Sequence, residues 1–167
     1  ENKIGSRVVV VGGGNVAVDV AVTARRLGAA SVTMVSLESL GELPATKEEL
    51  ERAQEEGVVV EPSWGPAAVE KSGEEISGIR LRRCVRVRDE EGRFAPVYDD
   101  QETKVLPADS VLLCVGQQTD LGFLGEDFAL EQNRGRIVAD GESQITSDED
   151  VYAGGDVVTG PSTVVSA

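Results

Sequence analysis

The chain has 167 residues, 40% of them hydrophobic, and a formal net charge of −14 at pH 7. This length suffices for one ordinary domain with a hydrophobic core, or for one domain with part of another. The negative charge argues against nucleic acid or an anionic membrane surface as a partner, because phosphate groups require a basic face. The apolar runs are far shorter than the roughly 20 residues that a membrane span needs. The N-terminus has no signal-peptide pattern.

Histidine is absent, and the two cysteines, Cys84 and Cys114, have neither CxxC nor metal-ligand spacing. The commonest general base and metal ligand is therefore missing, and we expect neither a catalytic residue nor a metal site in this chain. Both cysteines fall in strand-like segments, which favours buried free thiols over a disulfide or a redox pair. Their scarcity is typical of a cytoplasmic protein.

The first segment joins four valines at 8–11 to three glycines and a helix-compatible stretch. Consecutive β-branched residues that end at glycine predict a short strand buried on both faces, as in a parallel sheet. Gly12, Gly14 and Ala17 match the G-x-G-x-x-G/A fingerprint of a dinucleotide site. Gly12 would allow the tight turn, Gly14 the approach of a pyrophosphate, and Ala17 the close packing of helix on strand.

The helix that follows is predicted at about residues 16–27. Backbone N–H groups at its start, near Gly13, Gly14, Asn15 and Val16, would face the phosphate charge. Glycines at a strand-to-helix turn can also serve turn geometry alone. The strand before the turn, and the helix and second strand after it, favour the nucleotide site.

The second strand is predicted at Ser31–Ser36, and it leads to Leu37 and Glu38. Glu38 lies about 20 residues beyond the fingerprint, close to the acid that binds the ribose hydroxyls in Rossmann domains. Its position is equally consistent with a solvated loop glutamate. Residues 36–44 contain neither lysine nor arginine, so a 2′-phosphate would find no nearby cation in the sequence. The segment that includes Ser36, Leu37 and Glu38 therefore favours NAD over NADP.

A capping box at 46–49 predicts a second helix to about residue 56, and valines at 58–60 predict a third strand. The order strand, helix, strand, helix, strand predicts an α/β fold with a parallel sheet. We therefore expect a Rossmann-like, three-layer NAD(P)-binding domain.

An antiparallel β-meander is predicted where a third crossover helix would otherwise stand. At 79–88, four aliphatic residues alternate with arginines, which would place the aliphatic side chains on one face of a strand. Residues 94–98 and 103–106 are two further strand candidates. The arginines form either a docking surface for an acidic partner or a phosphate, or simply the solvated face of a strand.

The apolar run at 111–115 would return the chain to the parallel sheet. That return places Val115, Gly116 and Gln117 at the carboxyl edge, which is the ligand side of an open α/β sheet. A short strand is expected at 135–138.

The last segment combines glycine with small polar residues. It predicts a strand that ends at Gly155 and Asp156, and then a helix capped by Ser162 or Thr163 after Pro161. Such a segment allows close approach of a ligand to the backbone.

These segments together resemble the glutamate synthase small-subunit family, which comprises FAD- and NAD(P)H-dependent electron-transfer flavoproteins related to the pyridine nucleotide–disulfide oxidoreductases. The motifs that carry the resemblance are VVVVGGGNVAVD at 8–19, LPA at 43–45, EEG at 55–57, SWGP at 63–66, RFxPVY at 93–98, VGQ at 115–117 and YAGGDVVTGPSTVV at 152–165.

The resemblance implies an NAD(P)H domain inserted into a discontinuous FAD domain. By this similarity, residues 1–120 form the NAD(P)H-binding Rossmann-like domain, and residues 121–167 are a fragment of the FAD domain of a longer parent. The FAD contacts in that parent would come from Gly155, Asp156, Pro161, Ser162 and Thr163. The implied partners are the missing half of the FAD domain and an iron–sulfur electron-transfer subunit or domain.

The expected function is the NAD(P)H-binding portion of a flavin-dependent oxidoreductase that passes hydride to FAD and electrons on to an iron–sulfur partner. The isolated chain is expected to be inactive. The alternative is a non-catalytic NAD-binding sensor or assembly module, but such a module has no need of the flavin segment.

Two further expectations concern the cofactor and the tail. Where many members of the family carry arginines after the second strand, this chain has Leu37, Glu38 and Leu40, which again favours NAD. The apolar residues Val151, Val157 and Val158 would be exposed without a partner strand, which allows a homodimer through the tail.

Overall fold

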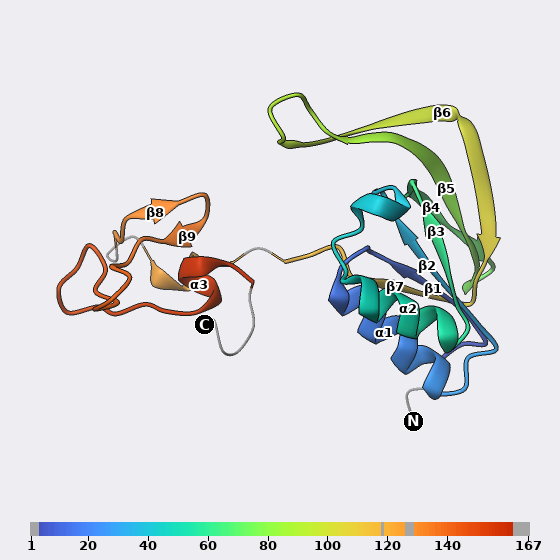
Figure 1. The fold of residues 1–167 in the computed structure, drawn as a ribbon, viewed down its shortest axis with the longest axis horizontal. Helices are drawn as coiled ribbons and strands as arrows, with labels where there is room; N and C mark the ends of the chain where they lie inside the picture. The colour runs from blue at the N-terminus through green and yellow to red at the C-terminus, as the bar shows by residue number, and fades with distance from the viewer. Residues whose placement is uncertain (1–3, 118, 126–128, 162–167) are drawn as a thin grey trace. The chain divides into compact units, whose positions relative to one another are not determined.

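The computed structural model describes residues 4–117, 119–125 and 129–161. The chain divides into two compact units, Glu1–Gly116 and Gln117–Ala167. The first unit has three layers, with two helices on one face of a parallel sheet and an antiparallel sheet on the other (Figure 1). The predicted Rossmann-like α/β fold with an antiparallel meander is confirmed.

The parallel sheet has the strand order β3-β2-β1-β7. Its strands are β1 (Arg7–Val11), β2 (Ser31–Ser36), β3 (Val58–Pro62) and β7 (Ser110–Leu113). In the centre, Val10 pairs with Met34 on one side and Leu112 on the other. The two inner strands are covered on both faces, which explains why four consecutive valines form β1.

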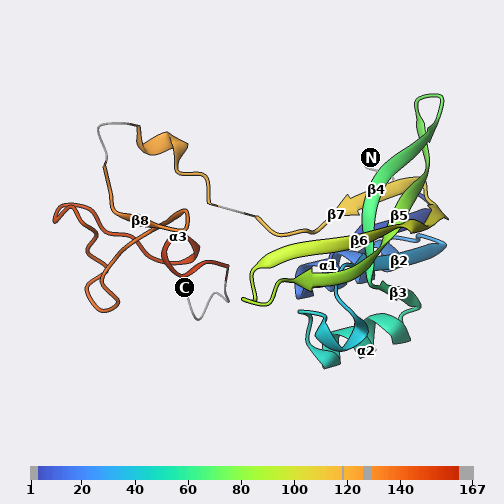
Figure 2. The ribbon, with the colours of Figure 1, turned by 90° about the horizontal axis from the view of Figure 1, so that it is seen from above.

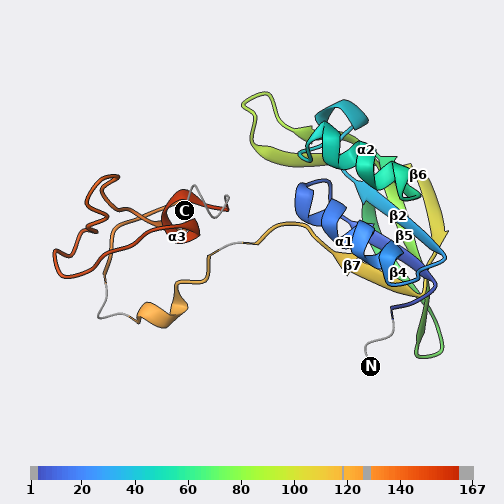
Figure 3. The ribbon, with the colours of Figure 1, turned by 60° about the horizontal axis from the view of Figure 1, so that its bottom comes forward.

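Two helices, α1 (Asn15–Arg26) and α2 (Lys47–Glu55), lie side by side on one face of this sheet (Figure 3). The buried side of α1 consists of small and β-branched residues at helical spacing, so the helix packs closely on β1 and β2. Thr46 caps α2, because its hydroxyl accepts a hydrogen bond from the backbone N–H of Glu49. Both predicted helices are confirmed, with ends shifted by one or two residues.

The antiparallel sheet consists of β4 (Trp64–Ser72), β5 (Glu75–Arg88) and β6 (Phe94–Pro107). It buries Ile79 and Leu81 against the face of the parallel sheet opposite the helices. Two sequence predictions need correction. The strand candidates at 94–98 and 103–106 are a single long strand, because register shifts let β6 pair with β5 along almost its whole length. Strand β4 was not predicted.

A β-bulge changes which side chains of β5 are buried. Ile79 and Leu81 are 1% and 0% exposed, but Val85 on the predicted apolar face is 67% exposed. The alternation is disrupted by register shifts between Arg82 and Arg83 and between Cys84 and Arg86. Residues 100–102 of β6 are unpaired at the first shift, and Val85 of β5 is unpaired at the second. The prediction of one continuous aliphatic face was therefore wrong beyond residue 82.

The arm, defined here as residues 85–97, is the end of the β5–β6 hairpin. It extends past the end of the parallel sheet (Figure 2). Its turn is held by Asp89, whose carboxylate accepts hydrogen bonds from the backbone N–H groups of Glu91 and Arg93, at 3.1 and 2.9 Å, and from the Arg93 side chain. Burial raises the pKa of Asp89, but the hydrogen bonds from Arg93 outweigh it and hold the pKa below its usual range.

The second unit contains a short hairpin, β8 (Gln132–Asn133) with β9 (Arg136–Ile137), and a one-turn helix, α3 (Asp156–Thr159). The hairpin turn has positive φ at Arg134 and Gly135, as a type I′ turn requires. The prediction of a strand that ends at Gly155 was wrong. Tyr152 forms only an isolated bridge to Ile145, and Gly155 turns the chain into α3 with φ of 70°.

Val151, Val157 and Val158 are each partly buried in the second unit. The apolar surface on which the expected homodimer depended is thus reduced, and the structure does not support that dimer. Ser162 and Thr163, predicted to cap a further helix, lie outside the described residues.

Both cysteines are free thiols. Across the described ranges, none of the helices combines the length and the apolar character that crossing a membrane requires. The same residues contain no group of three or more Cys, Asp or Glu side chains placed to hold a metal ion.

Candidate nucleotide-binding cleft

A cleft of about 550 Å³ opens at the carboxyl edge of the parallel sheet. Its floor is the glycine turn after β1, and its sides are the ends of β2 and β7 and part of the antiparallel sheet. Of the residues predicted for the nucleotide site, the cleft brings together Gly12, Gly13, Gly14, Ser36, Leu37, Glu38, Val115 and Gly116.

The three glycines have different surroundings. Gly12 has φ of +145°, and a Cβ there would clash with the backbone carbonyl of Cys114. A Cβ on Gly13 would clash with the hydroxyl of Ser36. A Cβ on Gly14 would meet nothing within 4 Å. Packing against backbone therefore requires glycine at Gly12, a side chain at Gly13 would have to displace the Ser36 side chain, and Gly14 leaves open space at the start of α1.

The N-terminus of α1 is suited to an anion. The first hydrogen bonds of the helix run from Ala17 and Val18 to the carbonyl of Gly14, at 2.9 and 3.2 Å. The N–H groups of Asn15 and Val16 precede these bonds and are free of intrahelical partners. The first turn carries no acidic residue, so the positive end of the helix dipole is not neutralised.

The side chains of the two predicted helix residues lie outside the lining of the cleft. Asn15 accepts a hydrogen bond from the N–H of Thr46 at 2.9 Å, which ties the start of α1 to the start of α2. Val16 is 68% exposed. What these two residues offer to a ligand in the cleft is therefore their backbone N–H groups.

Glu38 lies where β2 ends, half-buried against the cleft. The buried hydroxyl of Ser36 donates a hydrogen bond to the Glu38 carboxylate, and the backbone N–H of Ser63 donates to the Glu38 carbonyl at 2.8 Å. These contacts fix both the loop and its carboxylate at the cleft, with carboxylate lone pairs left to accept hydrogen bonds from hydroxyl groups.

The opposite side of the turn is formed by the chain that follows β7. Val115 and Gly116 line the cleft, and so does Cys114, which was not predicted as a site residue. Burial raises the pKa of the Cys114 thiol, so the thiol is protonated at neutral pH. Gln117 is outside the lining and begins the second unit.

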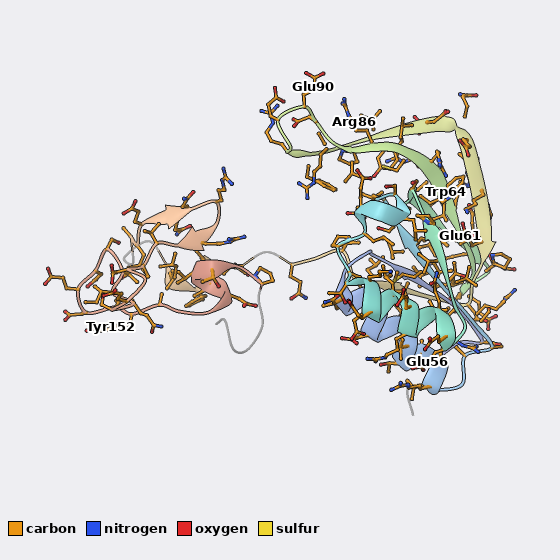
Figure 4. All side chains as sticks on the ribbon, in the orientation of Figure 1. Glu56, Glu61, Trp64, Arg86, Glu90 and Tyr152 are labelled. Atoms are coloured by element: carbon orange, nitrogen blue, oxygen red, sulfur yellow. The ribbon has the colours of Figure 1, made fainter. Side chains whose placement is uncertain are left out.

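An aromatic wall that the sequence did not reveal comes from the antiparallel sheet. Trp64, Pro66, Phe94 and Tyr98 line the cleft opposite the glycine turn. Trp64 is 9% exposed, and the Lys104 ammonium lies 4.1 Å from its ring centroid. Figure 4 shows Trp64 beneath the long strands of this sheet. The sequence contains only one Trp, two Tyr and three Phe, and one of each lines this cleft. The small number of aromatic residues is the feature of the sequence that could have marked these three as candidates for the site.

A second hollow, of about 330 Å³, adjoins the cleft. It shares Glu38 and Pro44 with the cleft. Its other lining residues are Glu42 and four consecutive residues of β5: Val85, Arg86, Val87 and Arg88.

The residues predicted to contact FAD belong to the second unit. Gly155 and the exposed Asp156 form the start of α3, and Pro161 is the last described residue. Ser162 and Thr163 lie outside the described part of the chain.

Comparison with known proteins places this geometry in a family. The sequence model of the family described as pyridine nucleotide-disulphide oxidoreductase matches residues 1–167. The chain belongs to this family. Its members are oxidoreductases that use FAD and NAD(P), and the predicted similarity to glutamate synthase small subunits is confirmed.

Two relatives illustrate the similarity. The chain is 39% identical over 167 residues to the NADP(+)-dependent formate dehydrogenase subunit beta of Moorella thermoacetica, covering 98% of this chain and 23% of that protein. It is 38% identical over 172 residues to the glutamate synthase [NADPH] small chain of Halomonas elongata, covering 98% of this chain and 35% of that protein. The chain therefore spans 23% and 35% of the length of these two relatives.

Among solved structures, the thioredoxin reductase of T. acidophilum aligns with a TM-score of 0.73 at 23% identity, covering 93% of this chain and 45% of that one. At this identity the likeness concerns the fold alone.

Proposed function

We propose that the first unit binds a nicotinamide dinucleotide in the cleft, with its pyrophosphate at Gly14 and the start of α1. The observation that carries this proposal is the open space at Gly14, beside two glycines whose surroundings are filled by the protein itself. Helix N–H groups free of intrahelical partners and an unneutralised helix dipole provide the attraction for the phosphate charge.

The ribose next to the pyrophosphate is assigned to Glu38, whose carboxylate accepts hydrogen bonds from ribose hydroxyls in such sites. A carboxylate at this position repels a 2′-phosphate, so we infer that NAD is preferred. Both relatives described above are named for NADP(H). The preference therefore rests on Glu38 of this chain and not on its family.

The oxidoreductase role follows from the family and the cleft together. When bound, the reduced nicotinamide supplies a hydride to FAD, and the protein contributes placement and electrostatics. The chain's own residues hold the pyrophosphate and ribose, while the aromatic wall of Trp64, Phe94 and Tyr98 shields the cleft from water. No general acid or base is required of this chain, which accords with the absence of histidine.

The FAD site and the electron acceptor are assigned to a longer protein. Gly155, Asp156, Pro161, Ser162 and Thr163 would contact FAD there, together with a further FAD-domain half, and an iron–sulfur subunit or domain would receive the electrons. The chain alone is expected neither to retain flavin nor to turn over. The free thiols favour a reducing compartment, and we infer the cytoplasm. Stoichiometric flavin absorbance in the purified chain would contradict this division of the site.

Isothermal titration calorimetry of the whole chain with NADH and NADPH tests the nucleotide assignment. NADH should bind more tightly than NADPH, and Glu38→Gln should narrow that difference by removing the repulsive charge. Glu102→Gln on the exposed part of β6 is the control, because it makes the same change in charge away from the cleft. Tighter binding of NADPH by the wild-type chain would overturn the preference for NAD, and absence of binding by both would overturn the function.

A further inference from the structure

We propose that the second hollow receives the adenine base of the bound dinucleotide, and that Arg86 and Arg88 of the arm are its specificity-determining contacts. The inference rests on the proposed function, since it extends the ligand from the ribose toward its base. The hollow is lined by Glu38, Glu42, Pro44 and residues 85–88.

The position of the hollow follows from the residues that it shares with the cleft. Glu38 and Pro44 line both. A ribose held at Glu38 carries its base on the neighbouring carbon, so the base must occupy the space that continues beyond Glu38 from the pyrophosphate. The second hollow is that continuation.

Two backbone hydrogen bonds of Ser63 link Glu38 to the strand that leads into the arm. Ser63, in a left-handed conformation with φ of 63°, donates its N–H to the Glu38 carbonyl at 2.8 Å. Its own carbonyl accepts a hydrogen bond from the N–H of Cys84 at 2.9 Å. The backbone two residues before Arg86 is thereby fixed relative to Glu38, and a base bound beside Glu38 would meet the arm at a defined position.

Apart from Arg83, which lies 5.5 Å from the centroid of the Trp64 ring, the arginines of β5 fall into two groups. Arg80 and Arg82 are paired with Glu70 and Asp100, at 2.6 and 3.4 Å, as expected for the solvated face of a strand. Among the residues that the structure describes, Arg86 and Arg88 have no carboxylate within 4.0 Å, and both line the hollow. The sequence left open whether these arginines form a solvated strand face or a binding surface. In the structure, Arg80 and Arg82 belong to a solvated face, whereas Arg86 and Arg88 line the hollow.

Guanidinium groups stack on the faces of aromatic bases, and their N–H groups donate to base edges. The Arg88 side chain donates one hydrogen bond to the Gly92 carbonyl, at 3.0 Å. This bond orients the guanidinium group and leaves its planar face available for stacking.

The charge of the hollow favours a neutral base over a phosphate. Its two guanidinium groups are balanced by the carboxylates of Glu38 and Glu42, so there is no excess of positive charge for a dianion. Apolar surface is supplied by Pro44, Val85 and Val87. Val85 is 67% exposed because of the bulge in β5, which places an aliphatic side chain at the hollow instead of in the core. A hollow with apolar walls and equal numbers of guanidinium and carboxylate groups suits an uncharged aromatic ring.

The test measures binding of NADH, NADPH, ADP-ribose and reduced nicotinamide mononucleotide to the whole chain by calorimetry. The double variant Arg86→Met, Arg88→Met should weaken NADH and ADP-ribose at least tenfold and leave the mononucleotide, which lacks adenosine, unchanged. Arg80→Met is the matched control, because it removes an arginine of the same strand outside the hollow. Circular dichroism confirms that each variant is folded.

Lysine replacements separate stacking from charge. Arg86→Lys with Arg88→Lys keeps both positive charges but loses the planar groups, so NADH should remain weakened. If lysine restores affinity and only NADPH responds to the methionine variants, the hollow binds a 2′-phosphate and the adenine assignment is wrong. If NADH binds the wild type and the methionine variants equally, the arm has no role. Absence of dinucleotide binding by the wild type would instead overturn the proposed function, and the inference with it.

Discussion

Substituting alanine at Gly14 separates an effect on nucleotide binding from an effect on folding stability. The backbone at Gly14 has φ of −92° and ψ of 175°, an extended conformation that alanine adopts without strain. A Cβ there has no protein atom within 4 Å. Gly12→Ala is the contrasting change, because it combines φ of +145° with a clash against the Cys114 carbonyl.

The expected magnitudes follow from these surroundings. Alanine is a poorer N-cap than glycine, but it also lowers the conformational entropy of the unfolded chain. These effects oppose each other, so Gly14→Ala should change the free energy of unfolding by less than about 1 kcal/mol. A methyl group at Gly14 would occupy the space through which the pyrophosphate approaches. Loss of one charge-assisted hydrogen bond costs about 1.5–3 kcal/mol, which corresponds to a rise in Kd of roughly 10- to 150-fold.

Gly12→Ala should mainly reduce the folding stability of the first unit. A residue forced into a disfavoured backbone region costs on the order of 1–3 kcal/mol, and the contact with Cys114 is to backbone, which cannot rotate away. We therefore expect Gly12→Ala to lower the stability of the first unit, and to lose affinity only as a consequence of that damage.

The assay combines urea unfolding of each variant with calorimetric titration of NADH. We expect Gly14→Ala to unfold like the wild type but to bind NADH weakly. If a folded Gly14→Ala variant binds NADH with wild-type affinity, the pyrophosphate does not lie at this residue. An unaltered stability for Gly12→Ala would show that the turn tolerates a Cβ, contrary to the geometry described above.

Three further predictions concern the core, the cleft and the helix pair. Leu81→Ala should destabilise the first unit by about 2–5 kcal/mol in urea unfolding, whereas the exposed Val85→Ala should stay within about 0.5 kcal/mol. Equal effects would contradict the bulge in β5. Cys114, whose pKa is raised by burial, should be alkylated more slowly than free cysteine at pH 8, with a rate that rises with pH and falls when NADH is added. Mass spectrometry that finds no protection by NADH would remove Cys114 from the ligand's surroundings. The hydrogen bond from Arg26 holds the pKa of Glu56 below its usual range, so this contact stabilises the protein above the ordinary pKa of about 4.3 and is lost as pH falls through the lowered value. The difference in melting temperature between wild type and Glu56→Gln should therefore be present at pH 7 and disappear in acid.

The parallel sheet and the glycine turn follow from local patterns in the amino-acid sequence. The four valines before Gly12, and the helix that follows, are local features whose periodicity and composition dictate a buried strand and an amphipathic helix. Because carboxyl ends of parallel strands meet at one edge, the positions of Glu38 and Gly116 beside the turn also followed from the sequence.

The residues that lie opposite the glycine turn depend on contacts between segments far apart in the sequence. The bulge in β5 depends on pairing with β6, and no local pattern encodes a register set by another strand. Residues 36–44 contain no cation, yet the fold brings Arg86 and Arg88 to the hollow beside Glu38 from another strand. Trp64 and Phe94 reach the cleft in the same way. Contacts between distant strands depend on packing, which is why the aromatic wall and the position of the arm beside Glu38 were not predicted.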